Sequence, residues 1–192
     1  DVQVINGLIR VNNEDVSSAT GLKQTNTYTL VPTPSNGYGL YNWTIEGYGS
    51  IGTDSLGNCS NIFTVGDGNA IITGNYTPLQ TITVSNIDNS GEVTTIETAQ
   101  GRTVAVSTST LVGDYIFVNW TEGGEEVSTS PYYSFVADSS KNLQANYRLR
   151  RYVQVSIDYG NHSETITMQE RSSKTINRRS EERRVGKECR YR

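Results

Sequence analysis

Apolar and polar residues alternate along short runs of this chain, and clusters of Gly, Asn, Asp and Ser separate one run from the next. Alternation with a period of two is typical of half-buried β-strands, whereas the apolar face of a helix repeats every three to four residues. Strand-forming Thr, Val, Tyr and Ile are frequent. We therefore predict an all-β chain. In its second third the pattern predicts six strands, at 80–86, 92–98, 102–108, 115–121, 132–137 and 142–148.

Residues that favour tight turns lie between these strands. Turns are predicted at 88–91, 122–125 and 139–142. The central Gly-Gly pair of the second turn suits a two-residue hairpin, because both central positions of a type I′ turn need a positive φ angle. Residues 67–68, Asp-Gly, predict a hairpin turn of the same kind earlier in the chain.

The pattern repeats along the chain. Both tryptophans lie in Asn-Trp-Thr triplets, at 42–44 and 119–121, and a Tyr stands five residues before each Trp. Each triplet is followed by a Phe strand, a polar turn and an Asn-Tyr pair. The tryptophans are 77 residues apart and the Asn-Tyr pairs only 71, so the first copy carries six additional residues, which fall in a loop around 47–57. Insertions confined to loops are what a shared fold tolerates.

The repeat predicts tandem copies of a small β module of about 70 residues. We expect module 1 at residues 1–78, module 2 at 79–149, and the start of a third copy at 150–177, because 152–156 repeats 81–85. A domain this small has little core, so its aromatic residues are expected to supply much of its stability. The expected core aromatics are Trp43, Trp120, Tyr38, Tyr115, Phe63, Phe135, Tyr76 and Tyr147.

Residues 103–107, 113–128 and 142–147 resemble the divergent internalin-type B-repeat, which occurs in tandem in bacterial cell-surface and secreted proteins. The resemblance covers 80–148 and, more loosely, 20–77. Module 1 departs from it by its longer loop and by Pro32 and Pro34. The resemblance implies an extracellular or cell-surface location and a β-rich module that spaces or presents other domains, with no catalytic residues to carry over.

Composition changes at residues 178–192, which carry seven basic against three acidic side chains. Such a run is compatible with a solvated basic helix or an anion-binding tail. Residues 179–190, however, resemble the translated read-through of a sequencing-library adapter, so we expect a non-native tail and leave it out of the fold. The remaining residues carry 9 basic and 17 acidic side chains, a net charge of −8, which disfavours nucleic-acid binding.

Candidate catalytic and metal-binding chemistry is sparse. The chain has one histidine, His162, and one cysteine outside the tail, Cys59. No nucleophile elbow, zinc-ligand cluster or phosphate loop is present. Residues 54–58 and 67–69 resemble calcium loops but lack the Glu that completes an EF-hand, and hairpin turns explain both. We therefore expect no catalytic residue, no metal and no cofactor.

Asparagine and tyrosine carry the remaining candidate sites. Asn-x-Ser/Thr sequons are glycosylation acceptors in eukaryotic secreted proteins, whereas here three of them are by-products of the repeated strand residues. Exposed aromatics stack on sugars or form protein interfaces, although sheets also favour Tyr for packing alone. The sequons are at Asn42, Asn58, Asn75, Asn119 and Asn161. The candidate ligand-facing aromatics are Tyr41, Tyr48, Tyr132 and Tyr133.

Two functions fit these observations. The first is a non-enzymatic repeat region of a bacterial surface or secreted protein, acting as a spacer, stalk or adhesion module. The alternative is an accessory carbohydrate-binding array attached to an extracellular enzyme outside these residues. The expected partner is a host or bacterial surface protein or a glycan. No membrane insertion is expected, because no apolar run reaches the roughly 18 to 20 residues of a membrane helix. The modules are expected to be monomeric units of a longer chain.

Overall fold

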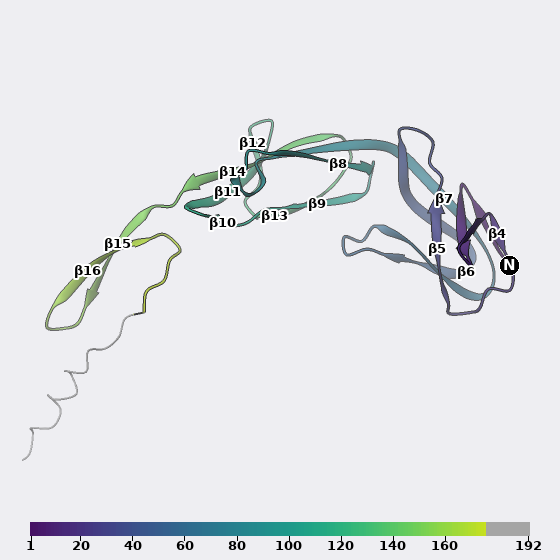
Figure 1. Ribbon diagram of the computed structural model, residues 1–192, viewed down its shortest axis with the longest axis horizontal. Coiled ribbons are helices and arrows are strands. Elements are labelled where there is room, and N and C mark those ends of the chain that lie inside the picture. The colour runs from purple at the N-terminus through teal and green to yellow at the C-terminus, as the bar shows by residue number, and fades with distance from the viewer. Residues whose placement is uncertain (176–192) are drawn as a thin grey trace, which may run out of the picture. The chain divides into compact units, whose positions relative to one another are not determined.

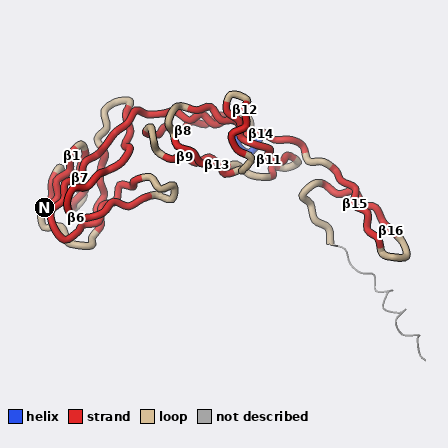
Figure 2. The backbone as a smooth tube through the Cα atoms, turned by 180° about the vertical axis from the view of Figure 1, so that it is seen from behind, coloured by secondary structure: helices blue, strands red, loops and turns tan. Residues whose placement is uncertain are grey.

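The computed structural model describes residues 1–175, and the predicted non-native tail lies outside the described residues. The chain divides into two compact units, Asp1–Arg148 and a second that begins at Leu149. Strands dominate both units, which confirms the predicted all-β class (Figures 1 and 2). Within the described residues the single helical element is a short 3₁₀ turn, η1 (Ile87–Asn89).

Module 1 is built around one long antiparallel hairpin of β6 and β7. On its other edge β7 pairs antiparallel with β5 at Thr27–Thr29 and parallel with β1 farther along. Strand β2 continues the sheet beyond β5, and β3 pairs with β2. The strands of this part are β1 (Val2–Ile5), β2 (Gly7–Val11), β3 (Glu14–Val16), β4 (Ser18–Ala19), β5 (Thr27–Pro32), β6 (Tyr38–Thr53) and β7 (Cys59–Ser85).

The long hairpin bends at glycines. Gly47 faces Ala70 across the hairpin and Gly49 faces Val65, so the four residues 66–69 lie opposite Tyr48 alone. This is an extended β-bulge, and Gly47 and Gly49 have φ angles of 102° and 136° that side chains rarely adopt. The prediction of a hairpin turn at 67–68 was therefore wrong. The chain bends there without reversing, because it keeps pairing with β6 on both sides.

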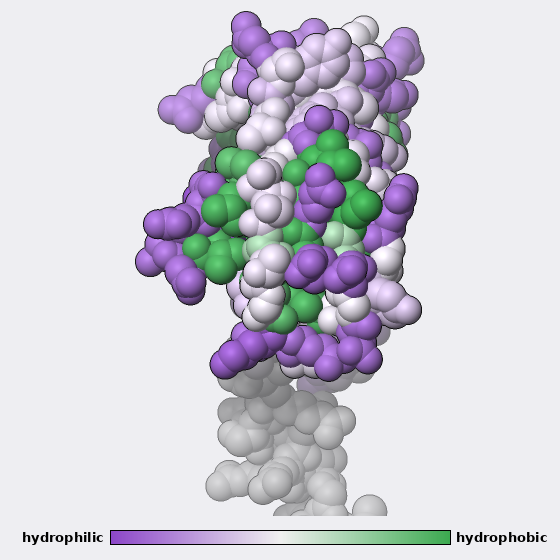
Figure 3. Space-filling model, turned by 90° about the vertical axis from the view of Figure 1, so that its right-hand side faces the viewer, coloured by the Kyte–Doolittle hydropathy of each residue, from purple (hydrophilic) through white to green (hydrophobic). Residues whose placement is uncertain are grey.

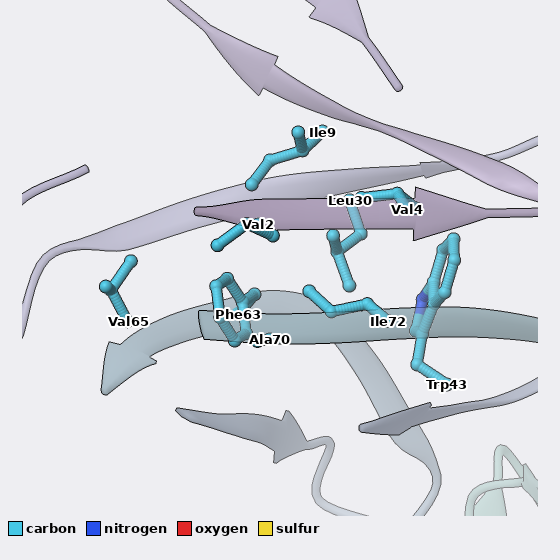
Figure 4. Packing of buried hydrophobic residues seen from close by; sticks show 9 residues of the cluster. All are labelled: Val2, Val4, Ile9, Leu30, Trp43, Phe63, Val65, Ala70 and Ile72. Atoms are coloured by element: carbon cyan, nitrogen blue, oxygen red, sulfur yellow. The ribbon is translucent and has the colours of Figure 1, made fainter. Parts of the chain in front are cut away.

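The bend brings the two halves of the hairpin over one apolar core (Figure 4). The core combines alternate residues of β1 and β7 with single residues of β2, β5 and β6. The Trp43 indole N–H donates to Asn61 Oδ1 (3.0 Å), so its polar atom is satisfied. The buried members are Val2, Val4, Ile9, Leu30, Trp43, Phe63, Val65, Ala70 and Ile72.

The surface of module 1 is mixed rather than uniformly polar. Figure 3 faces this module and shows apolar side chains scattered among hydrophilic ones. Exposed apolar residues of the module include Ile5, Ile62 and Ile71. Scattered apolar residues are ordinary on a protein surface, so they do not by themselves indicate an interface.

Module 2 contains the end of β7 and seven further strands. The end of β7 pairs antiparallel with β8 and parallel with β14, and β13 pairs with β9 in a separate two-stranded sheet. The core surrounds Trp120, which is 0% exposed. The strands are β8 (Val93–Ala99), β9 (Thr103–Ser107), β10 (Leu111–Val112), β11 (Tyr115–Glu122), β12 (Glu125–Ser128), β13 (Tyr132–Val136) and β14 (Lys141–Leu149).

The predicted strands of module 2 are confirmed. Five agree with β8, β9, β11, β13 and β14 to within one residue at each end, and the sixth is the end of β7. The short strands β10 and β12 were not predicted. Gly123 and Gly124 join β11 to β12 with φ angles of 60° and 92°, as a type I′ turn requires.

The structure corrects two of the expected core aromatics. Tyr38 is 46% exposed and Tyr115 is 38% exposed. Tyr38 is the first residue of β6 and Tyr115 is the first residue of β11, and a side chain at the end of a strand is covered by fewer neighbours than one in its middle. Among the other expected members, Trp43, Phe63 and Trp120 are buried, and three are half-buried: Phe135, Tyr76 and Tyr147.

The second unit contains a two-stranded antiparallel sheet of β15 (Tyr152–Asp158) and β16 (Ser163–Gln169). This sheet lies in the residues expected to begin the third copy, 150–177. Val153 and Val155 are 44% and 37% exposed, whereas their counterparts in module 2, Ile82 and Val84, are 0% and 1% exposed.

Candidate functional site

The Asn-Trp-Thr triplet of module 1 points its Trp into the core and its polar residues to the other face of β6. Asn75 on β7 donates through Nδ2 to Asn42 Oδ1 (2.9 Å) and to Thr44 Oγ1 (3.3 Å). One amide group therefore ties both polar residues of the triplet to the facing strand.

Module 2 repeats this arrangement. Asn146 Nδ2 donates to Asn119 Oδ1 (3.0 Å) and to Thr121 Oγ1 (3.0 Å). Asn119 also donates to Glu126 Oε2 at 2.6 Å. The repeated triplet and the repeated Asn-Tyr pair thus form one cross-strand unit, which accounts for the sequon pattern at these positions without invoking glycosylation.

A second group of polar residues lies at the joint between modules 1 and 2. The six-residue insertion lengthens the β6–β7 hairpin, and its tip, 54–58, reaches the first residues of β9. Asn58 Nδ2 donates to the Thr103 carbonyl (2.9 Å), and the Thr103 N–H donates to Asn58 Oδ1 (2.7 Å). The side-chain amide thereby satisfies both main-chain groups of Thr103, as a neighbouring strand would.

Arg102 adds further contacts across the joint. Its Nη1 donates to the Leu40 carbonyl of module 1 (3.2 Å), and its Nη2 lies 3.8 Å from Asp54 Oδ2. Thr77 Oγ1 donates to the Gln100 carbonyl at 2.7 Å. These groups close the joint with charge-assisted and neutral hydrogen bonds.

The Asp54 carboxylate organises the hairpin tip. It accepts hydrogen bonds from the Leu56 N–H (2.9 Å), the Asn58 N–H (2.9 Å) and Asn58 Nδ2 (3.1 Å). Partial desolvation acts to raise the pKa of Asp54, but these hydrogen bonds and Arg102 outweigh it and hold the pKa below its ordinary value. The carboxylate is thus engaged by its own turn. No cluster of His, Cys, Asp or Glu able to hold a metal occurs among residues 1–175.

Tyr41 also lies at this joint. A Cβ added at Gly101 of module 2 would lie 2.9 Å from its Cε2, so the absence of a side chain there admits the ring. Tyr41, Asn58, Arg102 and other residues of the joint line a pocket of about 370 Å³. The three other candidate aromatics do not line it.

Those three tyrosines have different surroundings. Tyr48 is 59% exposed and packs beside Gly68, where a Cβ would lie 2.4 Å from its ring. Tyr132 is 54% exposed, while its neighbour Tyr133 is half-buried and packs on Phe135 with the ring centres 5.1 Å apart. The four candidates therefore do not share one pocket.

An open groove of about 630 Å³ lies on module 1, at the beginning of β6. The sequence analysis missed most of its lining residues, because they come from loops and from a strand face assigned to the core. The proline-containing link at 32–35 was the available signal. The lining residues are Asn6, Thr33, Ser35, Tyr38, Gly74, Asn75 and Tyr76.

The remaining reactive side chains have structural surroundings. His162 stacks on Tyr159 with the ring centres 4.7 Å apart, and its Nδ1 lies 2.9 Å from Asn161 Oδ1. Cys59 is half-buried, and its Sγ accepts the Trp43 main-chain N–H at 3.3 Å. In the described part of the chain no helix is long and apolar enough to cross a membrane.

Comparison with known proteins finds one family. The sequence model of the family described as "Divergent InlB B-repeat domain" matches the chain twice, at residues 9–80 and 81–151. The two matches are adjacent and contain both tryptophan triplets. No curated protein and no solved structure matches the chain.

Proposed function

The chain belongs to the divergent InlB B-repeat family, and we propose that it is a non-enzymatic repeat region of a bacterial surface or secreted protein that spaces other domains at a fixed separation. Repeat domains of this family are generally not catalytic. The proposal includes an extracellular location, since repeats of this type belong to bacterial surface proteins.

The joint between modules 1 and 2 is the observation that carries this proposal. Strand β7 runs without interruption from Cys59 in module 1 to Ser85 in module 2. The Asn58 amide and the Arg102 guanidinium bridge the same two modules beside that strand. A linker of Gly and Ser would act as a flexible coil. A shared strand with bridging side chains instead resists bending, which is the property that a spacer needs.

The distance between two spin labels, one in each module, tests the rigidity of the joint. The exposed residues Lys23 and Ser139 are suitable sites, as Lys23→Cys and Ser139→Cys in a chain that carries Cys59→Ser and Cys189→Ser. Pulsed electron–electron double resonance of the doubly labelled full chain is expected to give one narrow distribution of label-to-label distances.

Removing the bridging side chains is expected to broaden that distribution. The test variant combines Asn58→Ala with Arg102→Ala, and the matched control is Asn36→Ala in an exposed turn of module 1. The control should keep the narrow distribution. A parent chain whose distribution is already as broad as that of the double variant would contradict a spacer of fixed length.

A further inference from the structure

The link that precedes the Trp strand differs between the two modules. In module 2 this link contains β10, which pairs with the start of β11 through Leu111 with Ile116 and Val112 with Tyr115. In module 1 the same link contains Pro32 and Pro34, and no strand of the described chain pairs with β6 in this way. Proline lacks the N–H that a ladder needs. The start of β6 is therefore uncovered, and the groove lies there.

The walls of the groove are held in place by one phenol. Tyr76 Oη donates to the Asn6 carbonyl (2.5 Å) and accepts the Thr33 N–H (2.7 Å), which links the two loops that flank the groove. Gly74 leaves room beside them, since a Cβ there would lie 2.6 Å from the Asn6 carbonyl oxygen. The groove is thus formed before any ligand arrives.

The lining has a defined chemistry. It contains hydroxyl and amide groups and two phenol rings but no charged side chain. Tyr38 is 46% exposed there. The Asn75 side chain lies on the face of β7 opposite Gly74 and Tyr76, where its Nδ2 donates to Asn42 and Thr44, so the side-chain amide available to the groove is that of Asn6. An exposed aromatic ring beside uncharged donors and acceptors matches the apolar face and the hydroxyl groups of a sugar.

We infer that this groove binds a neutral saccharide, with Tyr38 stacking on a sugar ring and Asn6 and Ser35 hydrogen-bonding to its hydroxyl groups. The absence of charge in the lining disfavours anionic sugars, because a desolvated carboxylate or sulfate would find no cation. The inference adds a binding activity to the spacer and does not depend on it.

Calorimetric titration of the full chain with cellohexaose, xylohexaose, mannohexaose and chitohexaose tests the inference. At least one is expected to bind saturably. Tyr38→Ala is expected to lower that affinity about tenfold or more, while Tyr38→Phe, which keeps the ring, retains most of it. Tyr115→Ala is the matched control, because Tyr115 is the exposed counterpart in module 2, where β10 pairs with it.

Circular dichroism of each variant establishes that it is folded. If Tyr38→Ala fails to fold, Ser35→Ala replaces it, since that change removes only a hydroxyl group from the groove, and it should weaken binding measurably. No saturable binding of any of the four sugars would overturn the inference. Equal losses in Tyr38→Ala and Tyr115→Ala would overturn it too, as would saturable binding of an extended peptide in place of sugar. None of these outcomes changes the label-to-label distances that test the spacer.

Discussion

The indole of Trp43 lies against two glycines, and the space they leave sets the packing of module 1. A Cβ added at Gly7 would lie 2.4 Å from Cη2 of Trp43 and 3.2 Å from the Val31 carbonyl oxygen. Neither the buried ring nor the backbone has room to move. We expect Gly7→Ala to lower the free energy of unfolding by about 1–3 kcal/mol, the usual cost of overpacking a core. Urea denaturation followed by tryptophan fluorescence measures it.

Gly52→Ala is the control for this prediction. A Cβ at Gly52 would lie 2.9 Å from Ser60 Oγ, which is the end of a side chain that can rotate away. The stability of this variant should stay close to that of the parent. Equal effects of the two substitutions would show that lost glycine flexibility, and not contact with Trp43, determines the result.

A second residue-scale prediction concerns Asp88 and pH. Its carboxylate accepts the Ser109 N–H (2.8 Å) and the Thr108 hydroxyl (3.2 Å), and these hydrogen bonds, the Ser109 contact first, hold the pKa of Asp88 below its ordinary value. A carboxyl group whose pKa is depressed in the folded state stabilises the fold above its unfolded pKa of about 3.9. That contribution is lost as the pH falls through the folded pKa.

Asp88→Asn is the informative variant, because Asp88 has a φ angle of 52° that Asn tolerates well. The variant should be less stable than the parent at pH 7. The difference between their urea midpoints should shrink as the pH falls from 5 to below the folded pKa. A difference that stays constant over this range would mean that the charge of Asp88 does not contribute.

At the scale of elements, the alternation of apolar and polar residues predicted those strands and turns that depend on neighbouring residues in the sequence. Alternation located five strands of module 2 to within one residue but not the short β10 and β12, and the Gly-Gly pair identified the β11–β12 turn. The Asp-Gly pair at 67–68 led to a wrong prediction, because Gly permits the backbone angles of both a hairpin turn and a bulge. Pairing of β7 with β6 on both sides of the pair decides for the bulge. For Tyr38, the aromatic repeat was given more weight than its place at the first residue of the strand.

The joint between the modules and the groove could not be predicted from the alternation of neighbouring residues. Alignment of the two copies located the insertion, but the loop expected at 47–57 was wrong for 47–53, which belong to strand β6. The contact of Asn58 with Thr103 joins residues 45 positions apart. The groove needs Asn6 and Tyr76, which are 70 positions apart. Contacts of such long range leave no periodic signal in a single sequence. The prolines of the link predicted only that this loop differs from its counterpart.

At the scale of the whole first unit, the shared strand should couple the stability of the two modules. Repeat proteins gain stability from the interface between neighbouring repeats as well as from each repeat alone. Here that interface consists of the continuous β7, the Asn58 amide and the Arg102 guanidinium. A substitution that destabilises the core of module 2 should therefore also lower the stability of module 1, although the two cores share no buried residue.

Leu143→Ala tests this coupling. Leu143 is 2% exposed in the core of module 2, and its truncation should cost about 2–5 kcal/mol there. In a chain with Trp120→Phe, Trp43 fluorescence reports on module 1 alone, and coupling predicts that Leu143→Ala lowers the urea midpoint of that signal. Adding Asn58→Ala and Arg102→Ala should reduce the transmitted shift, because the side-chain part of the interface is then gone. A Trp43 transition unmoved by Leu143→Ala, while circular dichroism reports earlier unfolding of module 2, would establish that the modules unfold independently despite the strand that joins them.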